Sequence, residues 1–197
     1  RGKMAVEYLP GDNLHGGTDR SMVSLQHSQF FFNRRGLLRV KLNNVSDDEY
    51  FEDFGSSIGV TSQRFLDRRA TFFYRGSRTN IYTLIQAYQT VDSSISSSRG
   101  PYRRLPQIYV RHRMPTLGRL RAEVNADATY FYRDDSLTAG RLNVAPSFSY
   151  EYTSSYLSLK PKLTLRHTQY FMDDPDSIFD DNESRSVPIL SIDSSLF

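Results

Sequence analysis

The sequence predicts an all-β protein whose antiparallel, up-and-down strands form a segment of a transmembrane β-barrel, about ten strands of a much larger barrel. Three observations predict this fold class. Polar and apolar side chains alternate along most of the chain, as they do along a strand with one dry and one wet face. The alternating runs reach the ~9–11 residues that a tilted strand needs to cross a membrane. Short and long connections between the runs also alternate along the chain. This is expected of a membrane barrel, which has short turns at one end and long loops at the other.

The clearest alternation covers residues 119–133, and the runs at 141–152 and 157–166 repeat it. A strand directs successive side chains to opposite faces, so each run has an apolar and a polar set. We expect the apolar set to face lipid: Leu120, Val124, Tyr130, Val144, Phe148, Tyr150, Leu159 and Leu163. We expect the polar set to face the lumen: Arg119, Arg121, Glu123, Arg141, Asn143, Glu151, Lys160, Lys162 and Arg166. The basic members have the chemistry to attract phosphates, although hydration of a polar lumen is the simpler interpretation for any one of them.

Weaker runs at 2–8, 21–32, 37–45, 62–75, 80–91, 106–114 and 187–197 bring the total to about ten strands, and no segment predicts a helix. We expect long connections at 10–20, 46–61, 92–105 and 172–186. Short ones are expected at 33–36, 76–79, 115–118 and 153–155, with 134–139 intermediate. Outer-membrane barrels keep short turns on the periplasmic side and long loops outside. Pro146 and Pro161 each remove one ladder hydrogen bond, so we expect local weakness or a bulge at both.

The composition excludes several classes of protein. Only 38% of the 197 residues are hydrophobic, and no run approaches the ~18 apolar residues of a membrane helix. Tyr and Phe, 13 of each, favour strands, while the absence of Trp mildly disfavours a complete barrel with full aromatic girdles. A net charge of +3 is too balanced for a nucleic-acid partner. Without cysteine, and with four scattered histidines, the chain predicts no disulfide, metal site or cofactor.

Two motifs suggest chemistry that their surroundings do not support. Residues 55–59 fit the G-x-S-x-G pattern, but hydrolase nucleophiles need a strand-to-helix turn and a nearby His base. Ser57 is therefore not expected to be catalytic, and we predict no enzyme. The acidic residues between 173 and 183 lack an ordered calcium-loop pattern and indicate a solvated loop.

Four stretches carry a family resemblance. Residues 4–12 end in a Tyr-Leu-Pro-x-Asp corner, and residues 45–54 contain a Val-Ser-Asp…Tyr-Phe-x-Asp-Phe loop. Residues 102–107 and 187–194 follow in order. In order and spacing these stretches resemble the barrel domain of the lipopolysaccharide-assembly protein family LptD (OstA, Imp). The resemblance spans essentially the whole chain, and the Tyr-Phe-x-Asp-Phe loop is its most specific part.

The resemblance implies transport. Residues 1–197 would be a partial barrel domain, truncated at both ends, in the outer membrane of a Gram-negative cell. The whole protein would receive lipopolysaccharide from the periplasmic bridge and insert it into the outer leaflet. Its partners would be outer-membrane lipid, an LptE-like lipoprotein plug, and an LptA-like bridge that docks through an N-terminal domain not present in this chain.

Two alternatives stay open at this point. Another outer-membrane barrel, either porin-like or an enzyme, would share the strand pattern but would need its own constriction loop or a converging Ser/His/Asp set. A soluble all-β binding module would have to bury its apolar face inside the chain. An exposed apolar face would separate the membrane interpretation from the soluble one.

Overall fold

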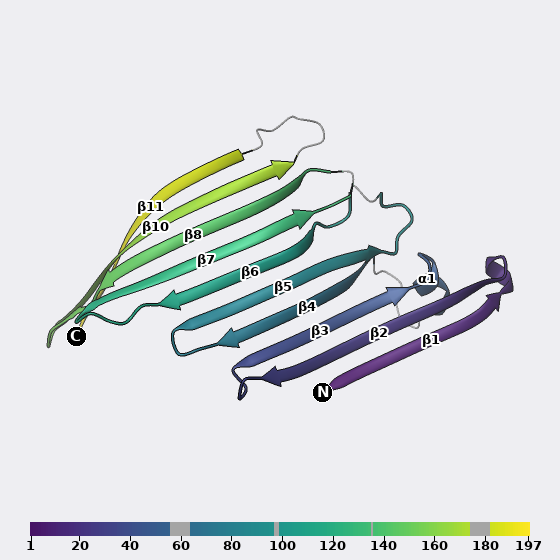
Figure 1. Cartoon of the computed structure of the whole chain (residues 1–197), viewed down its shortest axis with the longest axis horizontal. Coiled ribbons are helices and arrows are strands. Elements are labelled where there is room, and N and C mark those ends of the chain that lie inside the picture. Colours follow the sequence, from purple (N-terminus) through teal and green to yellow (C-terminus); the bar gives the residue numbers. More distant parts are fainter. Residues whose placement is uncertain (56–63, 97–98, 135, 174–181) are drawn as a thin grey trace.

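Ten long strands form one antiparallel sheet in which each long strand pairs with the next long strand in sequence (Figure 1). This computed structural model describes residues 1–55, 64–96, 99–134, 136–173 and 182–197. The first and last strands lie at opposite edges, so the sheet is open (Figure 1). The predicted all-β, up-and-down architecture of about ten strands is confirmed.

The strands are long enough to cross a membrane, at 10 to 17 residues for all but the short β9. In chain order the elements are β1 Gly2–Asp12, the 3₁₀ turn η1 Asn13–His15, β2 Thr18–Phe31, β3 Gly36–Val45, α1 Tyr50–Phe54, β4 Phe65–Arg75, β5 Thr79–Thr90, β6 Arg103–Arg113, β7 Leu120–Tyr132, β8 Thr138–Tyr150, β9 Tyr152–Thr153, β10 Leu157–Asp173 and β11 Asn182–Leu196.

The strand register sorts side chains onto two faces, which we call the apolar face and the polar face. Phe148 is the direct partner of Ala122 on β7 and of Leu163 on β10, and Leu163 is in turn the partner of Leu190. Directly opposed residues in an antiparallel pair share a face. This row and the parallel rows beside it therefore form the apolar face, and the alternate residues form the polar face.

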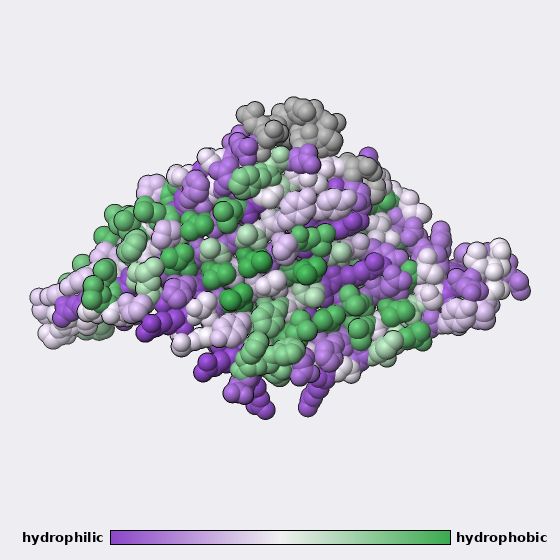
Figure 2. Space-filling view, in the orientation of Figure 1, coloured by the Kyte–Doolittle hydropathy of each residue, from purple (hydrophilic) through white to green (hydrophobic). Residues whose placement is uncertain are grey.

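The apolar face is exposed. It carries most of the exposed large hydrophobic side chains: Met4, Val6, Tyr8, Leu42, Ile85, Ile108, Leu120, Tyr130, Leu142, Phe148, Tyr150, Leu163, Leu165, Phe171, Leu190 and Ile192. Figure 2 shows hydrophobic side chains spread over neighbouring strands in the middle of the sheet, whereas the tip of the β1–β2 hairpin is largely hydrophilic. A soluble module would cover such a surface with another layer of the same chain.

Buried apolar side chains are few in the described part of the chain. Val45, Tyr50, Leu66 and Val91 form a small cluster where the β3–β4 and β5–β6 connections leave the sheet. The strand ladder, rather than a central core, therefore holds the described residues together. No helix among these residues is long and apolar enough to cross a membrane.

Several strand ends differ from the predicted ones. The run predicted at 157–166 continues to Asp173, and β11 begins at Asn182, so the connection expected at 172–186 is shorter. Residues 167–169 are polar on both faces, which hides their strand from the alternation pattern. The connection expected at 10–20 shrinks to residues 13–17 because β1 runs to Asp12 and β2 begins at Thr18.

Both in-strand prolines interrupt the same ladder. Between β8 and β10 the pairing lapses opposite Pro146 and again opposite Pro161, and it resumes each time with the register unchanged. The expected local weakness is present and the expected bulge is not, because a bulge would shift the register. Beyond the second gap, β9 continues the register of β8 against β10.

Replacing Pro146 by alanine supplies the missing N–H group at the first gap. We expect amide hydrogen exchange at Leu165 of β10, whose N–H group faces the gap, to slow about three- to tenfold, as expected for one additional ladder hydrogen bond. Hydrogen exchange of the full-length protein measures this, with the amide of Ala128 in β7 as the internal control. Unchanged exchange at Leu165 would mean that the gap has another cause.

Candidate functional site

Charged side chains on the polar face of β6, β7 and β8 are paired across strands. Arg111 lies 2.7 Å from the Glu123 carboxylate, and Arg113 lies 3.4 Å from it. On the next strand, Arg141 donates to Asp127 at 2.8 Å. Opposite charges on adjacent strands of one face attract and fix the register. This region, which we call the paired half, is therefore close to electrically neutral.

Hydrogen bonds join these ion pairs into a continuous network. Asn143 donates to Asp127 at 3.0 Å and accepts from Thr168 on β10 at 2.9 Å. Tyr109 donates to Asn125, which in turn donates to Glu123. These side chains thus find partners within the network, while Thr129 Oγ1 and the Nε atoms of Arg111 and Arg141 are buried without a hydrogen-bond partner among the described residues. The network keeps this polar surface in a fixed shape. Within the network, no nucleophilic side chain lies beside a base that could activate it.

The sequence-predicted polar residues have different surroundings. Arg121 pairs with Glu151 at 2.5 Å, while Glu123, Arg141 and Asn143 belong to the network above. Lys160, Lys162 and Arg166 lie on β10. Arg119 precedes β7, and its guanidinium lies 5.7 Å from the Tyr152 ring centre. The predicted apolar residues all lie on the apolar face by the register, and which face meets lipid stays a prediction.

The polar face of β1 to β5 differs from the paired half because its cations outnumber its carboxylates. Lys3, Arg39, Lys41 and Arg69 lie on this face by the register. In this part of the described chain, the only carboxylate within ion-pair distance of any of the four is Asp67, 3.1 Å from Arg69. We call this region the cationic half. The sequence analysis did not single out any of these residues.

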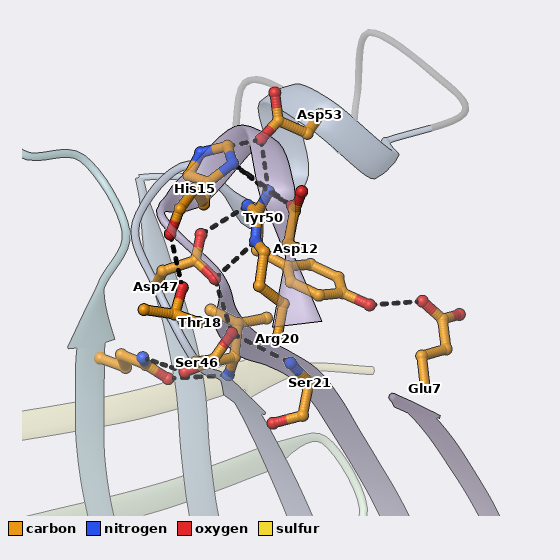
Figure 3. A network of polar contacts seen from close by, with 12 residues as sticks. Glu7, Asp12, His15, Thr18, Arg20, Ser21, Ser46, Asp47, Tyr50 and Asp53 are labelled. Atoms are coloured by element: carbon orange, nitrogen blue, oxygen red, sulfur yellow. Dashed lines mark hydrogen bonds and ion pairs between the residues drawn. The ribbon is translucent and has the colours of Figure 1, made fainter. Parts of the chain in front are cut away.

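One arginine is buried where the β1–β2 hairpin meets α1 (Figure 3). The Arg20 side chain is 2% exposed and binds three carboxylates. Its Nε and Nη2 donate to both oxygens of Asp47 at 3.0 and 2.6 Å, while Nη1 donates to Asp53 at 2.6 Å and Asp12 at 3.2 Å. The Phe54 ring centre lies 4.8 Å from the guanidinium carbon. This Arg20 cluster joins three separate segments of the chain.

Two further side chains, His15 and Tyr50, surround the guanidinium and its carboxylates (Figure 3). His15 lies between Asp12 and Asp53, 3.3 and 3.4 Å from their carboxylates. Tyr50 of α1 donates to Glu7 of β1 at 2.7 Å (Figure 3). The helix therefore reaches over the polar face of the first two strands. A planar arginine suits this position because its fork of donors can satisfy several carboxylates at once.

The protonation behaviour of the loop residues follows from this geometry. Burial alone would raise the pKa of Asp47, but hydrogen bonds from Arg20 and Ser46 outweigh it and lower that pKa. The carboxylate therefore stabilises the fold above its ordinary value of 3.8 and loses this effect as pH falls through the lowered folded-state pKa. Burial, together with the hydrogen bond to Glu7, raises the pKa of Tyr50 to about 12. Tyr50 is accordingly a neutral donor at physiological pH.

The Arg20 cluster brings together two of the four stretches that carried the family resemblance. Asp12 comes from the stretch at 4–12, and Asp47, Tyr50 and Asp53 come from the stretch at 45–54. The sequence analysis noted both motifs but not the arginine between them. Both motifs contain carboxylates, and the second also contains several aromatic rings. This composition could have indicated that the two motifs bind the same cationic side chain.

Other sequence motifs add no site to the described residues. Ser57 and most of the acidic stretch between 173 and 183 lie outside them. No group of three or more His, Cys, Asp or Glu side chains in the described ranges is placed to hold a metal ion.

Replacing Arg20 by methionine leaves three carboxylates without their cation. We expect a loss of about 3 kcal/mol in the free energy of unfolding, the usual effect of breaking a buried ion pair. Arg20→Lys should lose less, because lysine keeps the charge but not the two-pronged contact with Asp47. Denaturant titration of the full-length protein measures both variants.

Arg64→Met is the matched control, since Arg64 is 71% exposed and pairs with Asp92 at 3.6 Å. We expect this change to cost no more than about 1 kcal/mol. Equal losses for Arg20→Met and Arg64→Met would contradict a structural role for the buried cluster.

Comparison with known proteins identifies the family. The family model for LPS transport system D, LptD, matches residues 18–196. A protein named LPS-assembly protein LptD from Nitrosococcus oceani is 35% identical over 98% of this chain and 26% of its own length. Proteins of the same name from Alkalilimnicola ehrlichii and Aromatoleum aromaticum are 32% and 35% identical over 100% of the chain, and 26% and 24% of their own lengths. The chain spans about a quarter of the length of these relatives. Because the family model matches most of the chain, from the start of β2 to the end of β11, the chain belongs to the LptD family.

Proposed function

We propose that this chain forms part of the wall of an outer-membrane barrel that carries lipopolysaccharide to the outer leaflet. The observation that carries the proposal is the continuous ladder, which separates an exposed apolar face from a polar face rich in charge. In a membrane, backbone groups must be satisfied by the ladder itself, and one face must match lipid. The names of the related proteins supply the cargo.

In this proposal residues 1–197 are a partial barrel domain, and the strands that complete the barrel belong to the rest of the protein. The apolar face lies against outer-membrane lipid, and the polar face lines the lumen. An LptE-like lipoprotein plug and an LptA-like periplasmic bridge, both implied by the family, are the expected partners of the whole protein. The wall acts by shape, hydration and charge, and it needs no catalytic group.

A charge placed on the apolar face tests its contact with lipid. We expect Leu163→Lys to cost about 2–4 kcal/mol if the residue lies near the middle of the bilayer. Thr164→Lys adds the same side chain one residue along, on the polar face, and should cost far less. Unfolding of both full-length variants in lipid vesicles measures the difference, and equal costs would argue against a lipid-facing surface.

Photocrosslinking in cells tests the direction of each face. A photoreactive residue at Arg121, Asn143 or Lys162 should capture lipopolysaccharide or a luminal lipoprotein, because these positions share the polar face. The same probe at Phe148 or Leu163 should reach only membrane lipid. Crosslinks within the chain from the apolar positions, in a protein that stays soluble without detergent, would instead indicate a soluble β module.

A further inference from the structure

The cationic half of the polar face contains a straight row of side chains across five strands. The row is Lys3, Gln26, Lys41, Arg69 and Gln86, each the direct ladder partner of the next. Arg39 lies two residues from Lys41 on β3, in the adjacent row. Three cations and two amides thus lie side by side on adjacent strands, with a fourth cation beside them.

This row is electrostatically unfavourable by itself. Lys41 is directly opposite Arg69, and like charges in that arrangement destabilise a sheet. Asp67 contacts Arg69 at 3.1 Å and accepts from Gln86 at 3.0 Å. Among the described side chains, Asp67 is the only carboxylate within ion-pair distance of these four cations, so positive charge on the row is mostly unpaired. In the paired half, by contrast, Arg111, Arg113 and Arg141 each lie within ion-pair distance of a carboxylate.

A groove of about 870 Å³ runs over the row and is lined by all four cations. Its walls also include Phe73 and Tyr82, whose ring centres lie 4.8 Å apart. The guanidinium of Arg39 lies 5.9 Å from the Phe73 ring centre, so cation and aromatic surfaces are continuous. The volume falls in the range of small-molecule sites rather than of a protein interface.

We propose that this groove binds a phosphorylated saccharide, with phosphate on the cation row and a sugar ring against the Phe73–Tyr82 pair. Lysine and arginine supply charge-assisted donors to phosphate oxygens, and Gln26 supplies a neutral donor for hydroxyl groups. The aromatic rings present apolar surface to the C–H face of a sugar. A bound anion would relieve the repulsion between Lys41 and Arg69. The inference rests on the proposed function, since it names where the cargo meets the wall.

The test measures binding to the full-length protein purified with its luminal partner. The probes are a deacylated lipopolysaccharide saccharide with its phosphates, the same saccharide after phosphatase treatment, and inorganic pyrophosphate. Arg39→Gln/Lys41→Gln removes two groove cations. Arg34→Gln/Arg35→Gln removes two exposed cations from the turn between β2 and β3, outside the groove.

We expect the groove variant to bind the phosphorylated saccharide about tenfold more weakly, and the turn variant to bind it within about twofold of the unmodified protein. The phosphatase-treated saccharide should bind weakly to all three proteins alike. Equal losses in both variants would overturn the proposal in favour of diffuse positive charge. Pyrophosphate binding as tight as the saccharide would overturn the saccharide assignment.

Two further outcomes separate this proposal from the one on which it rests. Loss of the luminal lipoprotein from the groove variant, with unchanged saccharide affinity, would assign the groove to a protein contact and overturn the proposal. Crosslinks to lipopolysaccharide from Arg121 and Asn143 report on transport independently. If these crosslinks persist while the groove variant binds normally, only the groove proposal fails, and if they are absent from the unmodified protein, the transport proposal fails.

Discussion

The hydrogen-bonded ladder that joins the long strands in sequence order determines which side chains share a surface. A shift of one residue at any pairing would exchange the two faces of that strand. The β8–β10 ladder shows how strictly the register is kept, because it lapses at Pro146 and Pro161 and returns each time to the same pairing. With few buried apolar side chains, the described part of the chain depends on this backbone order more than on a core.

Charged side chains on this sheet have three kinds of surroundings. The paired half cancels its charges between neighbouring strands, as Arg141 and Asp127 do. The Arg20 cluster buries one cation beneath three carboxylates, a costly arrangement that becomes favourable only when every partner is present. The cationic half leaves Lys41 and Arg69 opposed. Of these two, only Arg69 has a carboxylate within ion-pair distance among the described side chains. The proposed anion would relieve the repulsion that this arrangement leaves.

The strands could be predicted from sequence because the alternation of polar and apolar residues is visible within each strand. The prediction failed where a strand lacks this alternation. Residues 167–169 are polar on both faces, so the pattern ends although β10 continues. Burial of Arg20 could not be predicted, since its carboxylates lie up to 33 residues away. The cationic row was missed for a related reason. Alternation assigns Lys3, Lys41 and Arg69 to a face of their own strands, and only the cross-strand register places them in one row.

The Arg20 cluster, at the ends of β1, β2 and β3, shares these strands with the cationic row. Along the polar face of β2, Arg20 at the hairpin end is followed by Ser24, Gln26 and Ser28. The cluster fixes the ends of β1, β2 and β3 relative to one another through Asp12 and Asp47. Repulsion between Lys41 and Arg69 favours separation of β3 and β4. Two hydrogen bonds between these strands oppose this movement, since Arg68 donates to the Asn43 carbonyl at 2.9 Å and Asn43 donates to the Asp67 carbonyl at 3.2 Å. The sheet can therefore hold unpaired cations in alignment for an anion without closing the gap between them. A flexible sheet would relax the repulsion and lose the site.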